Sequence, residues 1–179
     1  VFSGEPIVGR KFNFYTNDQD FANEKYLATD SYGLSKQVFD KIYGNKAIIL
    51  RGSIIGPGIV NKGSGLFDWV AFNRGNTLNG YTNHYWNGNT TLEFAKLAAK
   101  FVAESNKEFG IYTIGNKEVL TKYELIRKIS DVFRLKIDVK EFETEKAVDK
   151  TLQVSDLVLP FSKQIEELNF WCREHKILI

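Results

Sequence analysis

The chain has 179 residues, of which 43% are hydrophobic and 26% charged, and its formal net charge is +2. These values are those of an ordinary globular protein of one domain or one and a half, long enough to bury a sizeable core. The near-neutral charge gives no electrostatic reason to expect nucleic acid or an anionic membrane as the main partner. The single cysteine, Cys172, excludes an internal disulfide and favours a reducing compartment, which we take to be the cytoplasm.

The sequence has no apolar run of the roughly 18 residues that a membrane helix needs, so we expect no membrane span. The chain contains no methionine, and residues 1–4 read as the end of a strand that runs into a loop. We therefore expect a fragment or a processed chain whose earlier portion is missing. Removal of the initiator from a complete protein is the alternative.

The first predicted helix follows a long loop. Residues 4–29 combine glycine and proline with many polar residues, which is typical of a surface loop that carries function. Asp30 or Ser31 can cap a helix that runs to about Tyr43. Gly44 is then the expected stop.

A buried strand is predicted directly after this helix. Residues 47–50 are wholly apolar, which suits a strand buried on both faces in a parallel sheet covered by helices. The glycine-rich segment 51–58 follows at the carboxyl end of the strand, where open α/β sheets bind ligands. Helix, strand and glycine-rich exit make up half of a doubly wound pattern.

The second part of the chain contains two capping boxes. Thr90 with Glu93 predicts a helix to about Ser105, with one apolar face formed by Leu92, Ala95, Ala99 and Val102. Thr121 with Glu124 predicts another helix through about residue 133. The remaining expected elements are a short helix at 66–72, a buried strand at 110–115, an exposed or edge strand at 136–142 and a last helix capped by Ser162.

Tyr32 and Lys36 place a phenol and an ammonium one turn apart at the start of the first predicted helix. Side chains at i and i+4 share a face. A free phenol has a pKa of about 10, and a nearby ammonium favours its ionised form, so the pair is suited to proton transfer. The spacing alone is a weak signal in a chain with eight tyrosines, and an ordinary helix surface is the alternative.

The ordering of Ser31–Lys36 (Ser-Tyr-Gly-Leu-Ser-Lys), the apolar strand and the exit at 50–58 resembles the extended short-chain dehydrogenase/reductase family. Residues 80–96, which include Thr-Asn-His-Tyr-Trp-Asn-Gly, are similar to a segment of its sugar-nucleotide-binding, dTDP-4-dehydrorhamnose reductase-like branch. The resemblance implies an α/β fold: the C-terminal part of a Rossmann-type doubly wound parallel sheet plus a smaller α/β substrate-binding domain. Residues 1–58 would complete the dinucleotide-binding domain and 59–179 would form mainly the substrate domain, with 91–115 packing back on the sheet.

The same resemblance implies an NAD(P)H-dependent reductase of a nucleotide-linked 4-keto sugar. Tyr32 would donate the proton, and Lys36 would activate it and contact the nicotinamide ribose. The other residues implied to contact the cofactor are Gly52, Ser53 and Ile54, and those implied to contact the substrate are Asn83, His84, Trp86 and Asn87. The partner is then a nucleotide sugar rather than nucleic acid or a membrane, and a homodimer is compatible with the family.

Three departures from the family pattern keep other functions open. The glycine-rich dinucleotide fingerprint is absent from the sequence. The family's catalytic Ser or Thr would lie before Val1, and Ile54 stands where the reductases often carry an aromatic residue. The alternatives are an epimerase or dehydratase of the same family, and a non-catalytic module that binds a nucleotide sugar or regulates a partner.

Several residues have two readings from the sequence. His84 and Trp86 either line a nucleotide-sugar pocket or belong to a turn whose aromatic side chains pack on the core. Asp149 and Lys150 either contact a phosphate or form a solvated charge pair. Arg51 is expected to be a structural ion-pair partner rather than a ligand contact. With two histidines and one cysteine in the chain, no zinc site is expected, and Cys172 is expected to be semi-buried.

Overall fold

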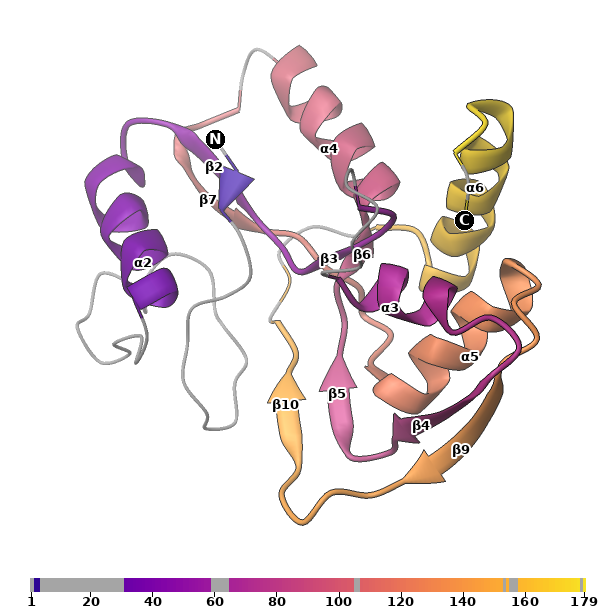
Figure 1. Ribbon diagram of the computed structural model, residues 1–179. Helices are drawn as coiled ribbons and strands as arrows, with labels where there is room; N and C mark the ends of the chain where they lie inside the picture. Colours follow the sequence, from indigo (N-terminus) through magenta and orange to yellow (C-terminus); the bar gives the residue numbers. More distant parts are fainter. Residues whose placement is uncertain are drawn as a thin grey trace.

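The computed structural model describes residues 2–3, 31–58, 65–104, 107–152, 154, 158–177 and 179 (Figure 1). Its helices are α2 (Ser31–Tyr43), α3 (Leu66–Phe72), α4 (Thr91–Ala103), α5 (Lys122–Val132) and α6 (Phe161–Glu174). Its strands are β1 (Phe2–Ser3), β2 (Ile48–Arg51), β3 (Ile54–Ile55), β4 (Thr77–Tyr81), β5 (His84–Trp86), β6 (Asn89–Thr90), β7 (Gly110–Thr113), β8 (Leu120–Thr121), β9 (Asp138–Phe142) and β10 (Val148–Lys150). The loop expected at 4–29 lies outside the described residues.

A parallel sheet in the order β1-β2-β7 forms one part of the molecule. Because side chains alternate along a strand, neighbouring residues of β2 face opposite sides of this sheet. Leu50 packs in a cluster with α4, whereas Arg51 pairs with Asp40 of α2. Helices therefore cover both faces of a parallel sheet, and the predicted α/β doubly wound class is confirmed (Figure 1).

The prediction of the buried face of α4 was wrong. The side chains that pack toward β2 and β7 are Phe94, Ala98 and Phe101, at i, i+4 and i+7. Val102 is 86% exposed, and Ala95 and Ala99 face solvent. Apolar residues occur nearly all around this helix, so periodicity alone could not select the stripe that meets the sheet. The two phenylalanines decide it because they bury the largest area.

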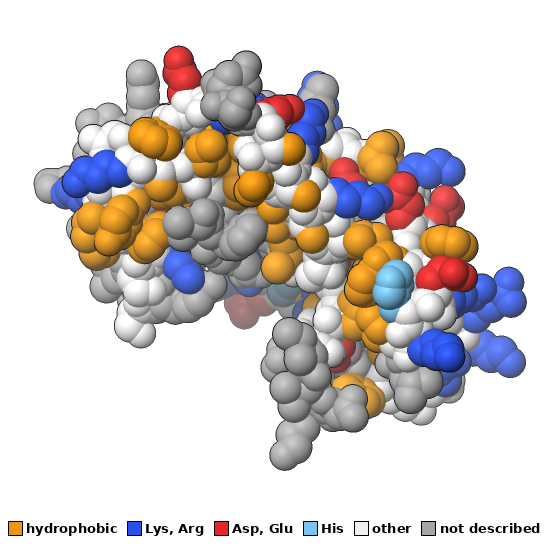
Figure 2. Space-filling model, turned by 90° about the horizontal axis from the view of Figure 1, so that it is seen from above, with side chains coloured by type: hydrophobic (Ala, Val, Ile, Leu, Met, Phe, Trp, Pro, Cys, Tyr) orange, Lys and Arg blue, Asp and Glu red, His pale blue; other side chains and the backbone are white. Residues whose placement is uncertain are grey.

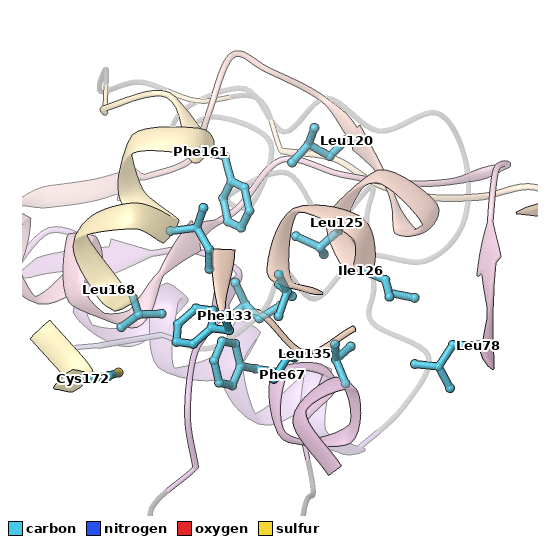
Figure 3. Close-up of a cluster of buried hydrophobic side chains, with 14 residues drawn as sticks. Phe67, Leu78, Leu120, Leu125, Ile126, Phe133, Leu135, Phe161, Leu168 and Cys172 are labelled. Atoms are coloured by element: carbon cyan, nitrogen blue, oxygen red, sulfur yellow. The ribbon is translucent and has the colours of Figure 1, made fainter. Parts of the chain in front are cut away.

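A second layer, made of short strands and of helices α3, α5 and α6, surrounds the larger of the two hydrophobic cores. β5 pairs parallel with β10 and antiparallel with β8, β4 pairs parallel with β9, and β3 pairs parallel with β6. Side chains of α3, α5 and α6 meet in a cluster that includes Phe67, Ile126, Phe133 and Leu168 (Figure 3). Phe67 and Phe133 pack edge to face, with ring centroids 5.0 Å apart.

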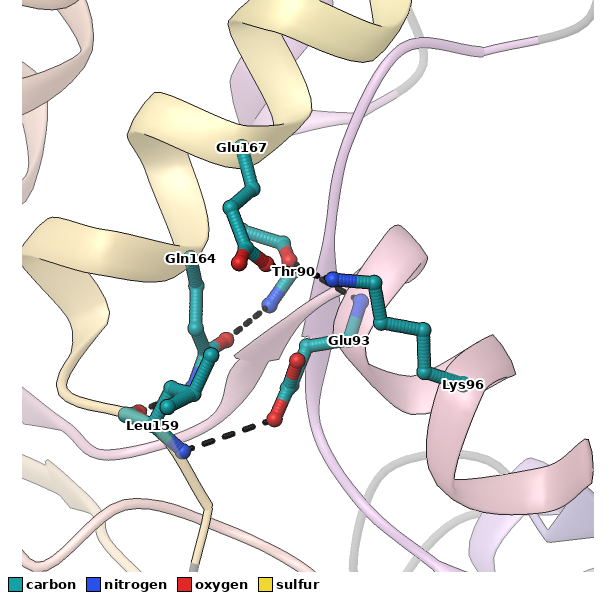
Figure 4. Close-up of polar contacts among 6 residues, drawn as sticks. All are labelled: Thr90, Glu93, Lys96, Leu159, Gln164 and Glu167. Carbon is teal, nitrogen blue, oxygen red and sulfur yellow. Dashed lines mark hydrogen bonds and ion pairs between the residues drawn. The ribbon is translucent and has the colours of Figure 1, made fainter. Parts of the chain in front are cut away.

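Polar contacts between α4 and α6 join the two cores (Figure 4). The backbone N–H of Thr90 donates to Gln164 Oε1 at 2.8 Å, and Gln164 Nε2 donates to the carbonyl of Leu159 at 2.7 Å. Thr90 caps α4 by accepting from the N–H of Glu93. The carboxylate of Glu93 does not complete the expected capping box but accepts from the N–H of Leu159 at 3.4 Å. A buried glutamate thus fastens the chain just before α6.

Among the remaining elements, those marked by a local sequence signal were mostly predicted correctly, and several strands without one were not predicted. α3 and the Thr121–Glu124 capping box of α5 are confirmed. Ser162 does not cap α6: the helix begins at Phe161 after Pro160, whose fixed backbone suits a helix start, and no side-chain cap is present. The strands β4, β5 and β10 were not predicted. Each pairs with a strand that is distant in the sequence, so a local pattern does not mark it.

The exposed surface mixes side-chain types. Basic, acidic and hydrophobic side chains are interspersed over the face in Figure 2, in keeping with the small net charge. Within the described part of the chain, no helix is both long and apolar enough to cross a membrane. Cys172 is fully buried beside Leu168 rather than semi-buried, because α6 turns it into the core, and this burial raises the pKa of its thiol.

Candidate functional site

A pocket of about 400 Å³ opens where the exit from the parallel sheet meets the second layer. Its walls come from β3, the beginning of α3, β5, the beginning of α5 and β10. The described lining residues that bear on its chemistry are Ile54, His84, Tyr85, Trp86, Lys122 and Lys150. A volume of this size is within the range of small-molecule sites, and a mainly apolar wall with a few convergent polar groups is typical of them.

Trp86 forms one wall and is held at both ends. Its indole Nε1 donates to Ser53 Oγ at 2.6 Å, and its ring packs edge to face on Phe161, with centroids 5.5 Å apart. Gly88 makes room for this arrangement, because a Cβ there would lie 2.1 Å from the carbonyl oxygen of Ser53 and 2.5 Å from the indole. The ring therefore packs on the core, as one of the two sequence readings has it, and it also lines this pocket.

The pocket has a positive electrostatic character. Lys122, Lys150 and His84 line it, and no Asp or Glu is among its described lining residues. Burial lowers the pKa of Lys122, and the charge of Lys150 lowers it further. Burial also lowers the pKa of His84, with further contributions from the charges of Lys122 and Lys150. The charge of Lys150 thus disfavours a proton on Lys122, and both lysines disfavour one on His84, which is the situation that a bound anion relieves.

The expected substrate residues divide into two groups. His84 and Trp86 line the pocket, whereas Asn83 and Asn87 are not among its lining residues. The carboxamide of Asn83 donates to the carbonyl of Thr144 at 2.7 Å and accepts from its N–H. The carboxamide of Asn87 is buried, donates to the carbonyls of Asn116 and Leu152, and accepts from the N–H of Leu152. The two amides thus tie loops together beside the pocket.

The expected cofactor segment follows β2. Ile54 is half exposed and lines the pocket, whereas Gly52 and Ser53 are buried behind it. A Cβ at Gly52 would lie 2.7 Å from the ring of Phe94, so this glycine allows α4 to approach the strand. The backbone carbonyl of Ser53 accepts from the N–H of Asn89 at 2.9 Å.

The expected catalytic pair lies on α2. The side chain of Tyr32 is outside the described residues, and Lys36 is half-buried on the helix. The described lining of the pocket includes no residue of α2. Arg51 is 1% exposed and donates from Nε to Asp40 Oδ2 at 2.9 Å, with Nη2 in ion-pair contact with the same oxygen at 2.8 Å, which confirms its structural role.

Lys122 and Tyr85 were missed by the sequence reasoning. Lys122 follows the N-cap Thr121, so it stands in the first turn of α5. A cation there opposes the helix dipole, which favours acidic residues at this end. That conflict was visible in the sequence once the capping box had located the start of the helix. Lys150 had been singled out, and it lines the pocket, whereas Asp149 accepts from the N–H of Thr151 in a local turn.

The comparisons with known proteins concern the fold. No protein-family model and no curated protein sequence matches the chain. Among solved structures, dTDP-4-dehydrorhamnose reductase from Bacillus anthracis in complex with NADP is 16% identical, with a TM-score of 0.69 over 95% of this chain and 64% of that one. The reductase from Clostridium acetobutylicum is 14% identical, with a TM-score of 0.71 over 96% and 65%. GDP-L-fucose synthetase from Naegleria fowleri is 10% identical, with a TM-score of 0.70 over 98% and 64%.

The chain thus spans slightly less than two thirds of the length of these proteins. A dTDP-glucose 4,6-dehydratase in complex with NAD and a UDP-N-acetylglucosamine 4-epimerase match with a TM-score of 0.62 each. The resemblance expected from the sequence is confirmed at the level of the fold: the chain has the Rossmann-like α/β fold of the dTDP-4-dehydrorhamnose reductases and of related nucleotide-sugar epimerases and dehydratases.

Proposed function

We propose that the pocket binds the phosphate-bearing part of a nucleotide sugar, and that the chain belongs to an NAD(P)H-dependent reductase of a nucleotide-linked 4-keto sugar. The observation that carries the proposal is the convergence of Lys122, Lys150 and His84 beside the indole of Trp86. The cations offer charge-assisted hydrogen bonds to a diphosphate. The indole offers a face for a base or a sugar ring.

The catalytic residues proposed for the reduction are Tyr32 and Lys36. When bound, a reduced nicotinamide supplies a hydride to the carbonyl carbon of the sugar. The hydroxyl of Tyr32 gives its proton to the carbonyl oxygen, so the ketone becomes a secondary alcohol and the phenolate takes up a proton from solvent. Lys36 stabilises this phenolate by its positive charge.

The described residues fit one end of such a cofactor. Ile54 presents an apolar side chain, 50% exposed, at the edge of the pocket, where a flat ring can lie against it. Lys36 lies on the helix packed against the strand that leads to Ile54. The sequence of the chain contains no glycine-rich fingerprint for the pyrophosphate. Among the described residues, the contacts that the chain offers are therefore for the nicotinamide ribose end.

Calorimetric titration of the protein with UDP-glucose and dTDP-glucose tests the binding half of this proposal. We expect saturable binding of at least one of these nucleotide sugars and none of glucose, because the lysines select the diphosphate. Binding that is unchanged when Lys122 and Lys150 are both replaced by Met would place the ligand elsewhere and contradict the proposal.

Assay of the complete protein with NADPH and a dTDP-linked 4-keto sugar tests the catalytic half. Tyr32→Phe should lower the rate of reduction by about 10²–10⁴-fold, the range that general acid catalysis supplies. Full activity of this variant would refute the catalytic assignment. A cofactor that stays bound as NAD throughout turnover, with no net consumption, would identify an epimerase or dehydratase instead.

A further inference from the structure

A buried ion pair joins the helix of the proposed catalytic residues to the central strand of the parallel sheet. Asp40 of α2 is 2% exposed and Arg51, the last residue of β2, is 1% exposed. Nε and Nη2 of Arg51 approach the same oxygen, Asp40 Oδ2, at 2.9 and 2.8 Å. Replacing such a buried pair by apolar side chains of similar volume is often neutral for stability, so stability alone is a weak account of why it is there.

The pair joins α2 to the end of the strand that leads to the pocket. Asp40 is one helical turn after Lys36 and two turns after position 32, so the three positions share one face of α2. Arg51 is two residues before Ser53, whose hydroxyl accepts from the indole of Trp86. A shift of α2 along β2 would thus move Lys36 relative to the pocket wall.

The backbone beside the pair strengthens this attachment. The N–H of Gly44 donates to the carbonyl of Asp40 at 2.8 Å at the end of α2, and a Cβ at Gly44 would lie 3.3 Å from Ile111 of β7. The carbonyl of Arg51 accepts from the N–H of Ile114 at 2.7 Å, just after β7. Asp40 and Arg51 are therefore each held on a rigid element, and the bond between their side chains sets the position of one element on the other.

The charges around Asp40 also reach Lys36. Burial raises the pKa of Asp40, and the charges of Arg51 on β2 and of Lys36 on α2 oppose this rise. The carboxylate is thus a shared counter-ion for both cations. Its loss would remove a negative charge that acts on both cations.

We propose that Asp40 is a positioning residue for the reduction: anchored by Arg51, it fixes the turn of α2 that carries Lys36 against the exit of β2. This inference rests on the proposed function, because Lys36 acts there on the phenol of Tyr32. Asp40 touches neither substrate nor cofactor in this scheme. It acts through Lys36.

The double variant Asp40→Leu/Arg51→Met separates positioning from simple stabilisation. It replaces both members of the buried pair together, so its melting temperature should fall less than that of either single variant. We expect kcat for reduction to fall at least tenfold, with KM for the nucleotide sugar within about twofold. A double variant that melts like the wild type and keeps its kcat would overturn the proposal.

Asp40→Asn gives a second, independent readout with little change of shape. Removing the carboxylate makes the surroundings of Lys36 more positive, which lowers the pKa of the phenol on which Lys36 is proposed to act, so the pH profile of kcat/KM should move to lower pH. Asp40→Glu should restore the wild-type profile. A profile of Asp40→Asn that coincides with the wild type would also overturn the proposal.

The exposed ion pair between Lys96 and Glu167, 2.5 Å apart, provides the matched control. Glu167→Gln removes a carboxylate from a pair that also joins two elements, and kcat and its pH profile should not change. Failure of the proposed function is recognised separately, because Tyr32→Phe would then leave reduction unaffected. If Tyr32→Phe abolishes reduction and the Asp40 variants keep wild-type kinetics, only the positioning role fails.

Discussion

The indole Nε1 of Trp86 donates a 2.6 Å hydrogen bond to the hydroxyl of Ser53, and this bond joins the wall of the pocket to the exit of strand β2. The carbonyl of Ser53 also accepts from the N–H of Asn89. Ser53 is thus fastened by its side chain and its backbone to the segment that presents Trp86. The bond ties the exit of β2 to β5 at the edge of the pocket.

Ser53→Ala should lower the free energy of unfolding by about 1–2 kcal/mol, because the half-buried indole N–H loses its acceptor. Urea unfolding followed by tryptophan fluorescence measures this change. Ser162→Ala is the matched control, since Ser162 makes no cap in α6 and alanine suits a helix interior. Equal stability of Ser53→Ala and the wild type would show that the bond does not stabilise the fold.

Gly88→Ala should be among the most destabilising single changes in the chain. The added Cβ would lie 2.1 Å from the carbonyl oxygen of Ser53, which is backbone and cannot move away easily. We expect a loss of about 3 kcal/mol or more, in the range of severe overpacking. At Gly65, the N-cap of α3, a Cβ meets no described atom within 4 Å, so Gly65→Ala should cost no more than the loss of a favourable cap residue, about 1 kcal/mol. Similar midpoints for the two variants in denaturant would contradict this expectation.

Lys122→Met should weaken nucleotide-sugar binding and leave the fold intact or slightly more stable. A charge-assisted hydrogen bond contributes about 1.5–3 kcal/mol, so Kd should rise at least tenfold. Removing a cation from the first turn of α5, close to Lys150, also removes a repulsion and an unfavourable interaction with the helix dipole. Calorimetry and thermal melting of the same sample measure both effects.

The control for this variant is Lys163→Met on α6, where Lys163 is exposed and pairs with Glu166. It should change neither affinity nor melting temperature appreciably. If Lys122→Met destabilises the fold by more than about 1 kcal/mol, the lysine supports the structure and its assignment to ligand binding is wrong.

The stability of the protein should fall between pH 7 and pH 5 in part because of His84. Burial and the charges of Lys122 and Lys150 lower the pKa of His84 from its ordinary 6.5 in the folded state. As the pH falls through 6.5 the unfolded chain takes up a proton that the folded chain resists, so unfolding becomes easier. The wild type should therefore lose more of its melting temperature than His84→Asn as the pH falls from 7 to 5.

The comparison is made as the slope of the melting temperature against pH for each variant. The slope should be smaller for His84→Asn, because the replacement binds no proton. Parallel slopes for the two proteins would mean that His84 titrates alike in the folded and unfolded states.

Local signals predicted much of the fold. The capping box at Thr121 and the short helix α3 lie where the sequence placed them, and the strand predicted at 47–50 lies at 48–51, because caps and apolar runs act over a few residues. The buried role of Arg51 was also predicted. The apolar face of α4 was not, since Leu92, Phe94 and Val102 are all apolar and only the sheet decides which of them it buries.

The residues of the candidate site also divide into those that the sequence indicated and those that only packing brings together. His84 and Trp86 could be named from the sequence as candidates, although their two readings could not be separated. Lys122 could not be joined to them, because it enters the pocket only through the packing of α5 beside β5. Asn83 and Asn87 belong to the same segment as Trp86, yet their amides bind backbone groups of residues that lie 29 to 65 positions away in the sequence.

The sequence by itself determined the alternation of helices and buried strands, the helix starts and the chemistry that Tyr32 and Lys36 make available on one helix. These follow from interactions between residues a few positions apart. Only the tertiary structure decided that Lys122, His84 and Lys150 share one pocket and that Asp40 meets Arg51. Those groups come from separate elements, and their proximity depends on how the helices pack on the sheet.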